Sequence, residues 1–152
     1  MCIDCLFCRI GQGLVPAVEV FRNKRIVAFL DISPIREGHL QIVPCAHHDT
    51  FDDLPPNIAS EVLLLAQRLA KAQKALFKVD RVGFLFTGGD IGHAHAHLVP
   101  LVAKTDITSR RYIANAELTW KSLPTPEEGE MRRTAAAIRA MLIEQRGKLR
   151  RA

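Results

Sequence analysis

Apolar residues gather in short runs between turn residues, and these runs predict the strands of the protein. In the first half of the chain they cover residues 18–22, 26–30 and 39–44. In the second half they cover residues 80–86 and 93–101. The last run alternates between polar and small apolar side chains, which is typical of a strand with one buried face.

Apolar residues at helical spacing predict two helices. Over about 58–77 they form one stripe, which consists of Val62, Leu65, Leu69, Ala72 and Leu76. A second helix is expected after Thr125, which can cap it, while Pro126 fits the first turn and Glu128 completes a capping box. Residues 102–124 indicate no element. Because the strands are neighbours rather than alternating with helices, the pattern favours an α+β fold with an antiparallel sheet.

Composition indicates a globular protein with one domain. The chain has 152 residues, of which 48% are hydrophobic and 24% charged, and this excludes a disordered chain. No apolar run approaches the roughly 20 residues that a membrane span needs. The first residues lack a basic start followed by an apolar stretch, so we see no secretory signal. We therefore expect a cytoplasmic protein with no membrane partner.

A net charge of +5 is compatible with a polyanionic partner. Much of the excess, however, lies at the C-terminus, in Arg146, Lys148, Arg150 and Arg151. Such a tail is typical of a solvated helix end, where cations interact favourably with the helix dipole. No nucleic-acid-binding motif accompanies it, so we do not expect a nucleic-acid partner.

Three of the histidines alternate with apolar residues in the last predicted strand. A strand would place His93, His95 and His97 on one face, roughly 6.5–7 Å apart. Such a row suits a catalytic zinc site, or phosphorus chemistry in which one imidazole attacks and its neighbours hold phosphate oxygens. The residues that directly follow the row include no acid, which favours phosphorus chemistry.

Several further motifs accompany this row. Residues 93–99 follow the pattern His-φ-His-φ-His-φ-φ, in which φ is apolar. Segments 5–10, 29–34 and 38–44, together with His47, match the N-terminal half of a known family in order and spacing. On these residues the chain resembles the histidine triad (HIT) superfamily of nucleotide hydrolases and transferases.

The resemblance covers about residues 4–101 and implies the architecture. We expect a HIT-like α+β fold with an antiparallel sheet, a main helix and an additional C-terminal helix. Residues 1–152 would form a single HIT domain, with residues 102–152 as a C-terminal extension. The resemblance also implies a homodimer in which two sheets join edge to edge.

The resemblance assigns the catalytic roles. His95 would attack the α-phosphorus of a nucleotide and form a nucleotidyl-histidine intermediate that water cleaves. His97 would contact the phosphate and donate a proton to the leaving group, while His93 and His39 would support the site. The transferase branch carries glutamine at the position of His97, so transfer to water is favoured.

The resemblance also assigns the substrate-binding residues. Asp31 would bind the ribose of a purine nucleotide, and Phe29 and Ile32 would line the base pocket. The residues alone leave open that Asp31 caps the turn that follows it.

The phosphate loop departs from the family pattern. Residues 87–92 form a shortened loop that lacks the family's asparagine and its Gly-Gln pair. Gly88 and Gly89 could still present backbone N–H groups to phosphate, whereas an inward Asp90 would repel it. This departure concerns substrate binding and leaves the histidine chemistry as it is.

The cysteines supply part of a second site. Cys5 and Cys8 form a Cys-x-x-Cys pair, which in a cytoplasmic protein suggests metal or redox chemistry rather than a disulfide framework. With His47 and His93 they coincide with a structural zinc tetrad of some branches of the superfamily. The resemblance thus implies a structural Zn²⁺, with no cofactor needed for the chemical step.

These observations lead to one function and one alternative. The function is hydrolysis of a nucleoside phosphoramidate or a dinucleoside polyphosphate at the α-phosphate, which releases a nucleoside monophosphate. The alternative is a zinc-stabilised nucleotide-binding interaction module with little or no turnover.

Overall fold

The computed structural model describes residues 5–87, 91–102, 106 and 125–149. The strands among them are β1 (Glu19–Arg22), β2 (Ile26–Leu30), β3 (Leu40–Pro44), β4 (Arg81–Thr87) and β5 (His95–Leu101). The helices are α1 (Leu6–Gly11), α2 (Pro56–Phe77) and α4 (Glu128–Leu149), with a short 3₁₀ helix η1 (Phe51–Asp53) before α2. The predicted strands and both predicted helices are present; the bounds of β2 agree with the prediction, and those of the other elements are shifted.

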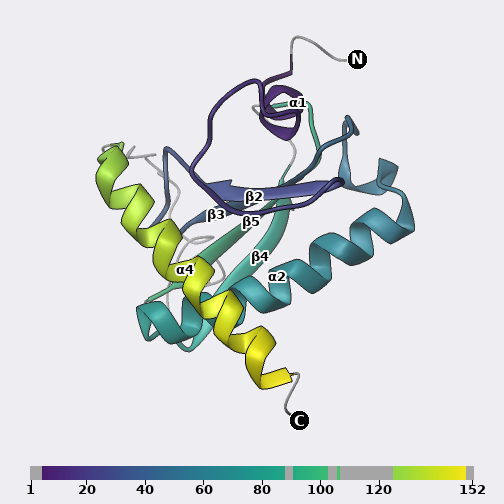
Figure 1. The fold of residues 1–152 in the computed structure, drawn as a ribbon. Coiled ribbons are helices and arrows are strands. Elements are labelled where there is room, and N and C mark those ends of the chain that lie inside the picture. Colours follow the sequence, from purple (N-terminus) through teal and green to yellow (C-terminus); the bar gives the residue numbers. More distant parts are fainter. Residues whose placement is uncertain (1–4, 88–90, 103–105, 107–124, 150–152) are drawn as a thin grey trace, which may run out of the picture.

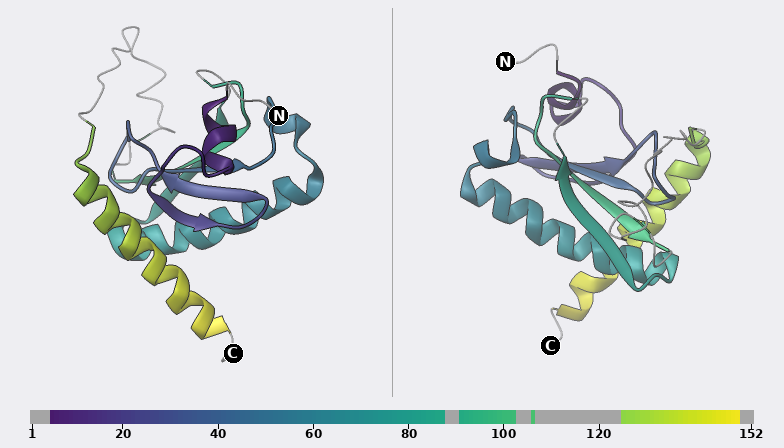
Figure 2. Two further views of the ribbon diagram at one scale, coloured as in Figure 1. Left: turned by 45° about the horizontal axis from the view of Figure 1, so that its top comes forward. Right: turned by 180° about the vertical axis from the view of Figure 1, so that it is seen from behind.

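The strands form one sheet in the order β1-β2-β3-β5-β4, and every neighbouring pair is antiparallel. The helices α2 and α4 cover one face of this sheet, and α1 lies over the other (Figures 1 and 2). This arrangement confirms the predicted α+β class with an antiparallel sheet.

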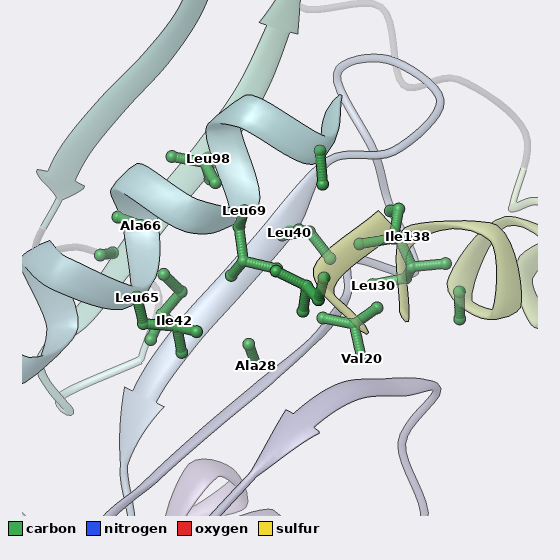
Figure 3. Close-up of a cluster of buried hydrophobic side chains, with 14 of the residues drawn as sticks. Val20, Ala28, Leu30, Leu40, Ile42, Leu65, Ala66, Leu69, Leu98 and Ile138 are labelled. Atoms are coloured by element: carbon green, nitrogen blue, oxygen red, sulfur yellow. The ribbon is translucent and has the colours of Figure 1, made fainter. Parts of the chain in front are cut away.

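Alternation along the strands separates two apolar clusters. Ile42 and Ala96 lie directly opposite each other on β3 and β5 and belong to the cluster under α2 and α4. Figure 3 shows part of this cluster, with Ile42 and Leu65 among the side chains that meet between the sheet and the helices. Val27 and Val43 belong to the smaller cluster under α1.

The C-terminal helix contributes to the larger cluster rather than lying on the surface. Its buried residues are Met131, Ala135, Ile138 and Leu142. The helix begins at Glu128, and the carbonyl of Glu127 accepts a hydrogen bond from the N–H of Met131 at 3.0 Å. The helix therefore starts three residues after Thr125, the predicted cap.

The helix α1 was not predicted from the sequence, because six residues are too few to show a helical period. Its end is held by Arg22, whose guanidinium donates hydrogen bonds to the carbonyls of Ile10 and Gly11 at 2.8 and 2.7 Å. Carbonyls at a helix end lack partners within the helix, so this contact fixes α1 on the sheet.

None of the helices in the described part of the chain combines the length and the apolar character that crossing a membrane requires.

Candidate functional site

The three histidines of the motif divide between two sites. His95 and His97 lie in β5 with their ring centroids 4.9 Å apart, on the face that α1 partly covers. His93 precedes the strand, because the backbone there pairs with loops: the N–H of Ala94 donates to the carbonyl of His48 at 2.6 Å. The expectation of three imidazoles along one strand is therefore corrected to two.

One tautomer of His95 is selected by its backbone contact. Its Nδ1 lies 2.7 Å from the carbonyl oxygen of His93, which can only accept a hydrogen bond. Nδ1 therefore carries the proton, and the lone pair of the neutral ring is on Nε2. The ring of Phe7 packs edge-on against His95 with centroids 5.2 Å apart. His95 thus presents a nucleophilic nitrogen in a fixed direction.

A chain of hydrogen bonds also selects the tautomers of His39 and His97. The N–H of Ile35 donates to Nδ1 of His39 at 3.2 Å, so the proton of neutral His39 is on Nε2. That nitrogen lies 2.9 Å from Nδ1 of His97 and donates to it. His97 therefore carries its own proton on Nε2.

Burial keeps both rings neutral. It lowers the pKa of His39 against the opposing effect of Asp31. Burial, followed by the neighbouring His39 and His95, lowers the pKa of His97 to about 4. Neutral rings are what the hydrogen-bond chain requires, since a second proton on His97 would set two N–H groups against each other.

Thr87 joins this constellation, although the sequence analysis placed it only at the start of the phosphate loop. Its Oγ1 lies 2.8 Å from Nε2 of His97 and 3.5 Å from Nε2 of His95. Thr87 ends β4 directly opposite His95. Only the pairing of β4 with β5 could have identified it.

Asp31 is held by two hydrogen bonds. Oδ1 accepts one from the N–H of Ser33 at 2.7 Å, which is the turn contact considered as the alternative role. Oδ2 accepts one from Nε2 of Gln41 at 2.6 Å and lies 3.7 Å from Nδ1 of His39. Gln41 was also missed, because its role follows from its place opposite His97 in the sheet.

The remaining predicted substrate residues differ in exposure. Phe29 is buried, and its ring lies 5.8 Å from that of Phe7. Ile32 has 65% of its surface exposed. Gly88 and Gly89 lie outside the described residues.

The structure brings Cys5, Cys8, His47 and His93 together. Their ligand atoms all lie within 4.8 Å of one another. Nδ1 of His93 is 3.4 Å from Sγ of Cys5 and 3.6 Å from Sγ of Cys8, and Nδ1 of His47 is 3.2 Å from Sγ of Cys8. Tetrahedral zinc with ordinary bond lengths separates sulfur and nitrogen ligands by about 3.5 Å. The four residues fit zinc.

The outer contacts of the two imidazoles support this fit. Nε2 of His47 lies 2.8 Å from Oδ1 of Asp49, and Nε2 of His93 lies 3.0 Å from the carbonyl oxygen of Pro44. Histidine ligands of metals generally donate their second ring N–H to a carboxylate or a carbonyl. Both Nδ1 atoms are thereby left to face the cysteines.

The HIT domain family model matches residues 12–103, which is more than half of the chain. The protein belongs to the HIT family. An adenosine 5′-monophosphoramidase of Saccharomyces cerevisiae is 35% identical over 101 residues, which are 63% of this chain and 61% of the yeast protein. The match thus spans less than two thirds of that relative. An adenylylsulfatase of Arabidopsis thaliana is 29% identical over 106 residues, 64% of this chain and 52% of the plant protein.

Solved HIT structures show the same fold. The crystal structure of a Zn-bound histidine triad family protein from Mycobacterium smegmatis has a TM-score of 0.76 and 23% identity. The likeness covers 97% of this chain and 99% of that one. It confirms the HIT-like fold that the motifs led us to expect.

The two clusters offer this HIT protein distinct chemistry. In the first cluster the lone pair of His95 and the N–H of His97 both face the hydroxyl of Thr87. The second offers two thiols and two imidazoles, which suit a tetrahedral metal. His93 connects them, because its ring belongs to the second and its carbonyl holds His95.

Proposed function

We propose that this HIT protein hydrolyses a nucleoside phosphoramidate or a dinucleoside polyphosphate through a nucleotidyl intermediate on His95. The observation that carries the proposal is the hydrogen bond from Nδ1 of His95 to the carbonyl of His93, at 2.7 Å. It leaves the lone pair on Nε2, beside the N–H of His97. The names of the yeast and plant relatives support an adenylyl compound as substrate.

The first step transfers the nucleotidyl group to the protein. Nε2 of His95 bonds to the α-phosphorus, and the bond from phosphorus to the leaving group breaks with its electron pair. In the second step water attacks the phosphorus and gives a proton to Nε2 of His97, which lost its own to the leaving group. The N–P bond breaks with its electron pair returning to Nε2 of His95, and the nucleoside monophosphate leaves. Splitting one displacement into two is the ordinary advantage of a covalent intermediate.

His97 supplies the proton for the leaving group after the His39–His97 pair has taken up one proton. Nδ1 of His39 is the entry point, because Asp31 Oδ2 lies only 3.7 Å away and can replace the N–H of Ile35 as its partner. With that proton on His39, the proton between the two rings moves to Nδ1 of His97. A bound anionic phosphate stabilises the resulting imidazolium.

The nucleoside binds beside these histidines. Each oxygen of Asp31 accepts one hydrogen bond from the protein and retains capacity for a ribose hydroxyl. Phe29 and Ile32 line the purine site, and the backbone of Gly88 and Gly89 contacts the phosphate. His93 and His39 act by positioning His95 and His97.

Cys5, Cys8, His47 and His93 hold a structural zinc ion. The zinc-bound mycobacterial relative supports this assignment. The metal would tie α1 to the loops that precede β5 and follow β3, and it takes no part in the transfer. Its two thiolate ligands require reduced cysteines, which suits a cytoplasmic location.

The protein forms a homodimer. β4 is an edge strand of the sheet, with β5 as its neighbour, so its outer side can pair with a second copy. Light scattering coupled to size-exclusion chromatography tests this assignment, and a monomer at micromolar concentration contradicts it.

The test of the activity measures AMP release from adenosine phosphoramidate by wild type, His95→Ala and His48→Ala. His48 is a matched control, since its side chain has no role in the proposed transfer. AMP from the wild type and His48→Ala alone supports the proposal. Turnover that persists in His95→Ala contradicts the assignment of the nucleophile.

The shortened segment 87–92 favours one other function, a nucleotide-binding module with little turnover. Calorimetry with AMP distinguishes it from the hydrolase. Tight binding of AMP together with no AMP release from phosphoramidate or from diadenosine polyphosphates favours the module.

A further inference from the structure

We propose that Gln73 of α2 holds His39 and His97 at their hydrogen-bonding distance, from the face of the sheet opposite to the substrate. The inference rests on the proposed function, because the reaction that it affects is the same nucleotidyl transfer. Gln73 does not touch the substrate in this role, so it is a positioning residue. It acts on the backbone of the two segments that carry the histidines.

Gln73 is a fully buried polar residue on the apolar side of α2. It follows Leu69 by one helical turn, so both side chains lie on the buried face of the helix. Burying a carboxamide costs stability unless its polar atoms have hydrogen-bond partners. An apolar side chain avoids this cost, so we expect the role of Gln73 to lie in the contacts of its amide.

The amide of Gln73 donates to two backbone carbonyls beside the site. Its Nε2 lies 2.7 Å from the carbonyl oxygen of Gly38 and 3.2 Å from that of Leu98. Both partners can only accept hydrogen bonds, so the NH₂ group must face them and the orientation of the amide is fixed. The buried Oε1 has no hydrogen-bond partner among the described residues. Both N–H groups therefore join the two segments, although one polar atom is left unsatisfied.

The two carbonyls lie where the pairing of β3 with β5 ends. The register of the two strands ends with Leu40 opposite Leu98, and both residues belong to the apolar cluster under α2 (Figure 3). Gly38 lies two residues before Leu40, beyond this last pair. The amide of Gln73 thus supplies a link between the two segments just where the strand pairing stops.

The histidine pair is attached to the same two segments. His39 directly follows Gly38, and His97 directly precedes Leu98. Successive side chains of a strand point to opposite faces, so His97 projects away from α2 while Leu98 points toward it. Nε2 of His39 lies 2.9 Å from Nδ1 of His97. Because Gln73 holds the backbone beside each ring, its amide limits how far the two rings can separate.

A second contact places Gly38 against the same helix. Its φ is +80°, a conformation that favours glycine, and a Cβ at this position would collide with the ring of Phe77. Phe77 is the last residue of α2 and lies one turn after Gln73. The backbone that leads into His39 is therefore held against α2 by a hydrogen bond and by close packing.

The separation of the two rings is important for the proposed proton transfer. The proton between His39 and His97 must cross from one ring to the other before His97 can protonate the leaving group. Such a transfer requires the two nitrogens to lie within hydrogen-bond reach. A displacement of about 1 Å in a catalytic site can slow a reaction roughly 10²-fold. We therefore expect the amide of Gln73 to affect the rate of transfer rather than the affinity for AMP.

Gln73→Met tests this role, because methionine has nearly the shape of glutamine and lacks its N–H groups. Leu69→Met is a matched control, since it introduces the same side chain one turn earlier, at a buried position that donates no side-chain hydrogen bond. Nuclear magnetic resonance of the free proteins detects the pair, through the low-field signal of the proton on Nε2 of His39. We expect this signal in the wild type and in Leu69→Met, and its loss in Gln73→Met.

Single-turnover formation of the adenylyl adduct from adenosine phosphoramidate measures the consequence for the reaction. We expect Gln73→Met to slow adduct formation roughly 10–100-fold. Leu69→Met should remain close to the wild type, although it also changes a completely buried residue of α2. The affinity for AMP, measured by calorimetry, should change far less than the rate. Urea unfolding establishes the temperature at which all three proteins are folded.

Hydrogen exchange in the wild type adds a measurement that needs no variant. If Gln73 holds the pair, the ring proton of His39 exchanges with solvent only when the side-chain amide of Gln73 also opens. The two groups should then share one free energy of opening. A ring proton that exchanges while the amide is still protected overturns the inference, even if Gln73→Met does not fold.

Two further results would overturn the inference. An unchanged ring signal and an unchanged adduct rate in a less stable Gln73→Met would make Gln73 purely structural. Equal slowing in Gln73→Met and Leu69→Met would assign the effect to core packing. If the wild type hydrolyses the substrate without forming an adduct, the proposed nucleotidyl-His95 intermediate fails. The ring signal of the free proteins still tests Gln73 in that case, so the two failures are distinguishable.

Discussion

His93 and His95 are joined by a hydrogen bond that links the two clusters of this protein. The carbonyl oxygen of His93 accepts from Nδ1 of His95 at 2.7 Å, while the ring of His93 lies 3.4 Å from Sγ of Cys5. A single residue therefore orients the proposed nucleophile and contributes to the proposed zinc site.

Zinc affinity should depend on Asp49, whose Oδ1 lies 2.8 Å from Nε2 of His47. We expect Asp49→Asn to weaken zinc binding about 10–100-fold, because the amide lacks the negative charge with which a carboxylate partner raises the basicity of a histidine ligand. Competition with a chromogenic chelator measures the affinity. Asp80→Asn is the control, since Asp80 is an exposed residue that precedes β4. Unchanged affinity in Asp49→Asn contradicts the contribution of Asp49 to the zinc site.

The C-terminal helix should be necessary for stability. Ile138 is fully buried in the cluster between the sheet, α2 and α4, and Ile138→Ala should reduce the free energy of unfolding by about 2–5 kcal/mol. Ile143 is 71% exposed on the same helix, and Ile143→Ala should change it by less than about 0.5 kcal/mol. Urea unfolding measures both. A small effect at Ile138 would mean that α4 detaches readily.

Stability should fall as the pH falls from about 6.5 to about 4, in part because of His97. Burial lowers the pKa of His97 to about 4 in the folded protein, whereas the unfolded chain has the ordinary value near 6.5. Between these values the unfolded state binds more protons, so acid favours unfolding. In His97→Gln the free energy of unfolding, measured with urea, should fall less between pH 7 and pH 5 than in the wild type. The same pH dependence in the two proteins contradicts a lowered pKa of His97.

Nuclear magnetic resonance tests the same ring directly. The His97 signals of the free protein should titrate near pH 4, and saturating AMP should raise this pKa because phosphate stabilises the imidazolium. A midpoint at or above 6.5 in the free protein would contradict the chain of hydrogen bonds from Ile35 through His39.

The sequence alone predicted the elements whose apolar residues form a run or recur at a regular spacing. Residues 26–30 became β2 with both ends in place, and the stripe from Val62 to Leu76 lies in α2. The sequence did not predict α1, because six residues are too few to show a helical period. It also misplaced the start of α4, which begins at Glu128 although Thr125 has the pattern of a helix cap. Local signals compete with tertiary packing at such ends.

The candidate site likewise contains residues that the sequence predicted and residues that it did not. The histidines and Asp31 were identified because a motif of known spacing contains them. Thr87 and Gln41 were missed because each acts through its opposite residue on a neighbouring strand, and no local pattern records the register. The place of His93 beside Cys5, Cys8 and His47 was also predicted, whereas its expected place in the strand was wrong because β5 begins only at His95.

Gln41 should determine how well the ribose is bound. Its amide donates to Asp31 at 2.6 Å, and Gln41→Leu removes this contact from the carboxylate that would bind the ribose. Because a hydrogen bond to a charged group contributes about 1.5–3 kcal/mol, we expect KM for adenosine phosphoramidate to rise roughly tenfold or more while kcat changes little. Deoxyadenosine analogues should show a smaller difference between the two proteins. A fall in kcat at unchanged KM contradicts this role.

The central claim is covalent transfer to Nε2 of His95. Brief exposure of the protein to adenosine phosphoramidate, followed by acid-free quenching, intact-mass spectrometry and peptide mapping, tests it most directly. The account predicts a transient adenylyl group in the wild type, on the peptide that contains His95, and none in His95→Ala. AMP release with no adduct at any time point, or an adduct that persists in His95→Ala, would contradict it.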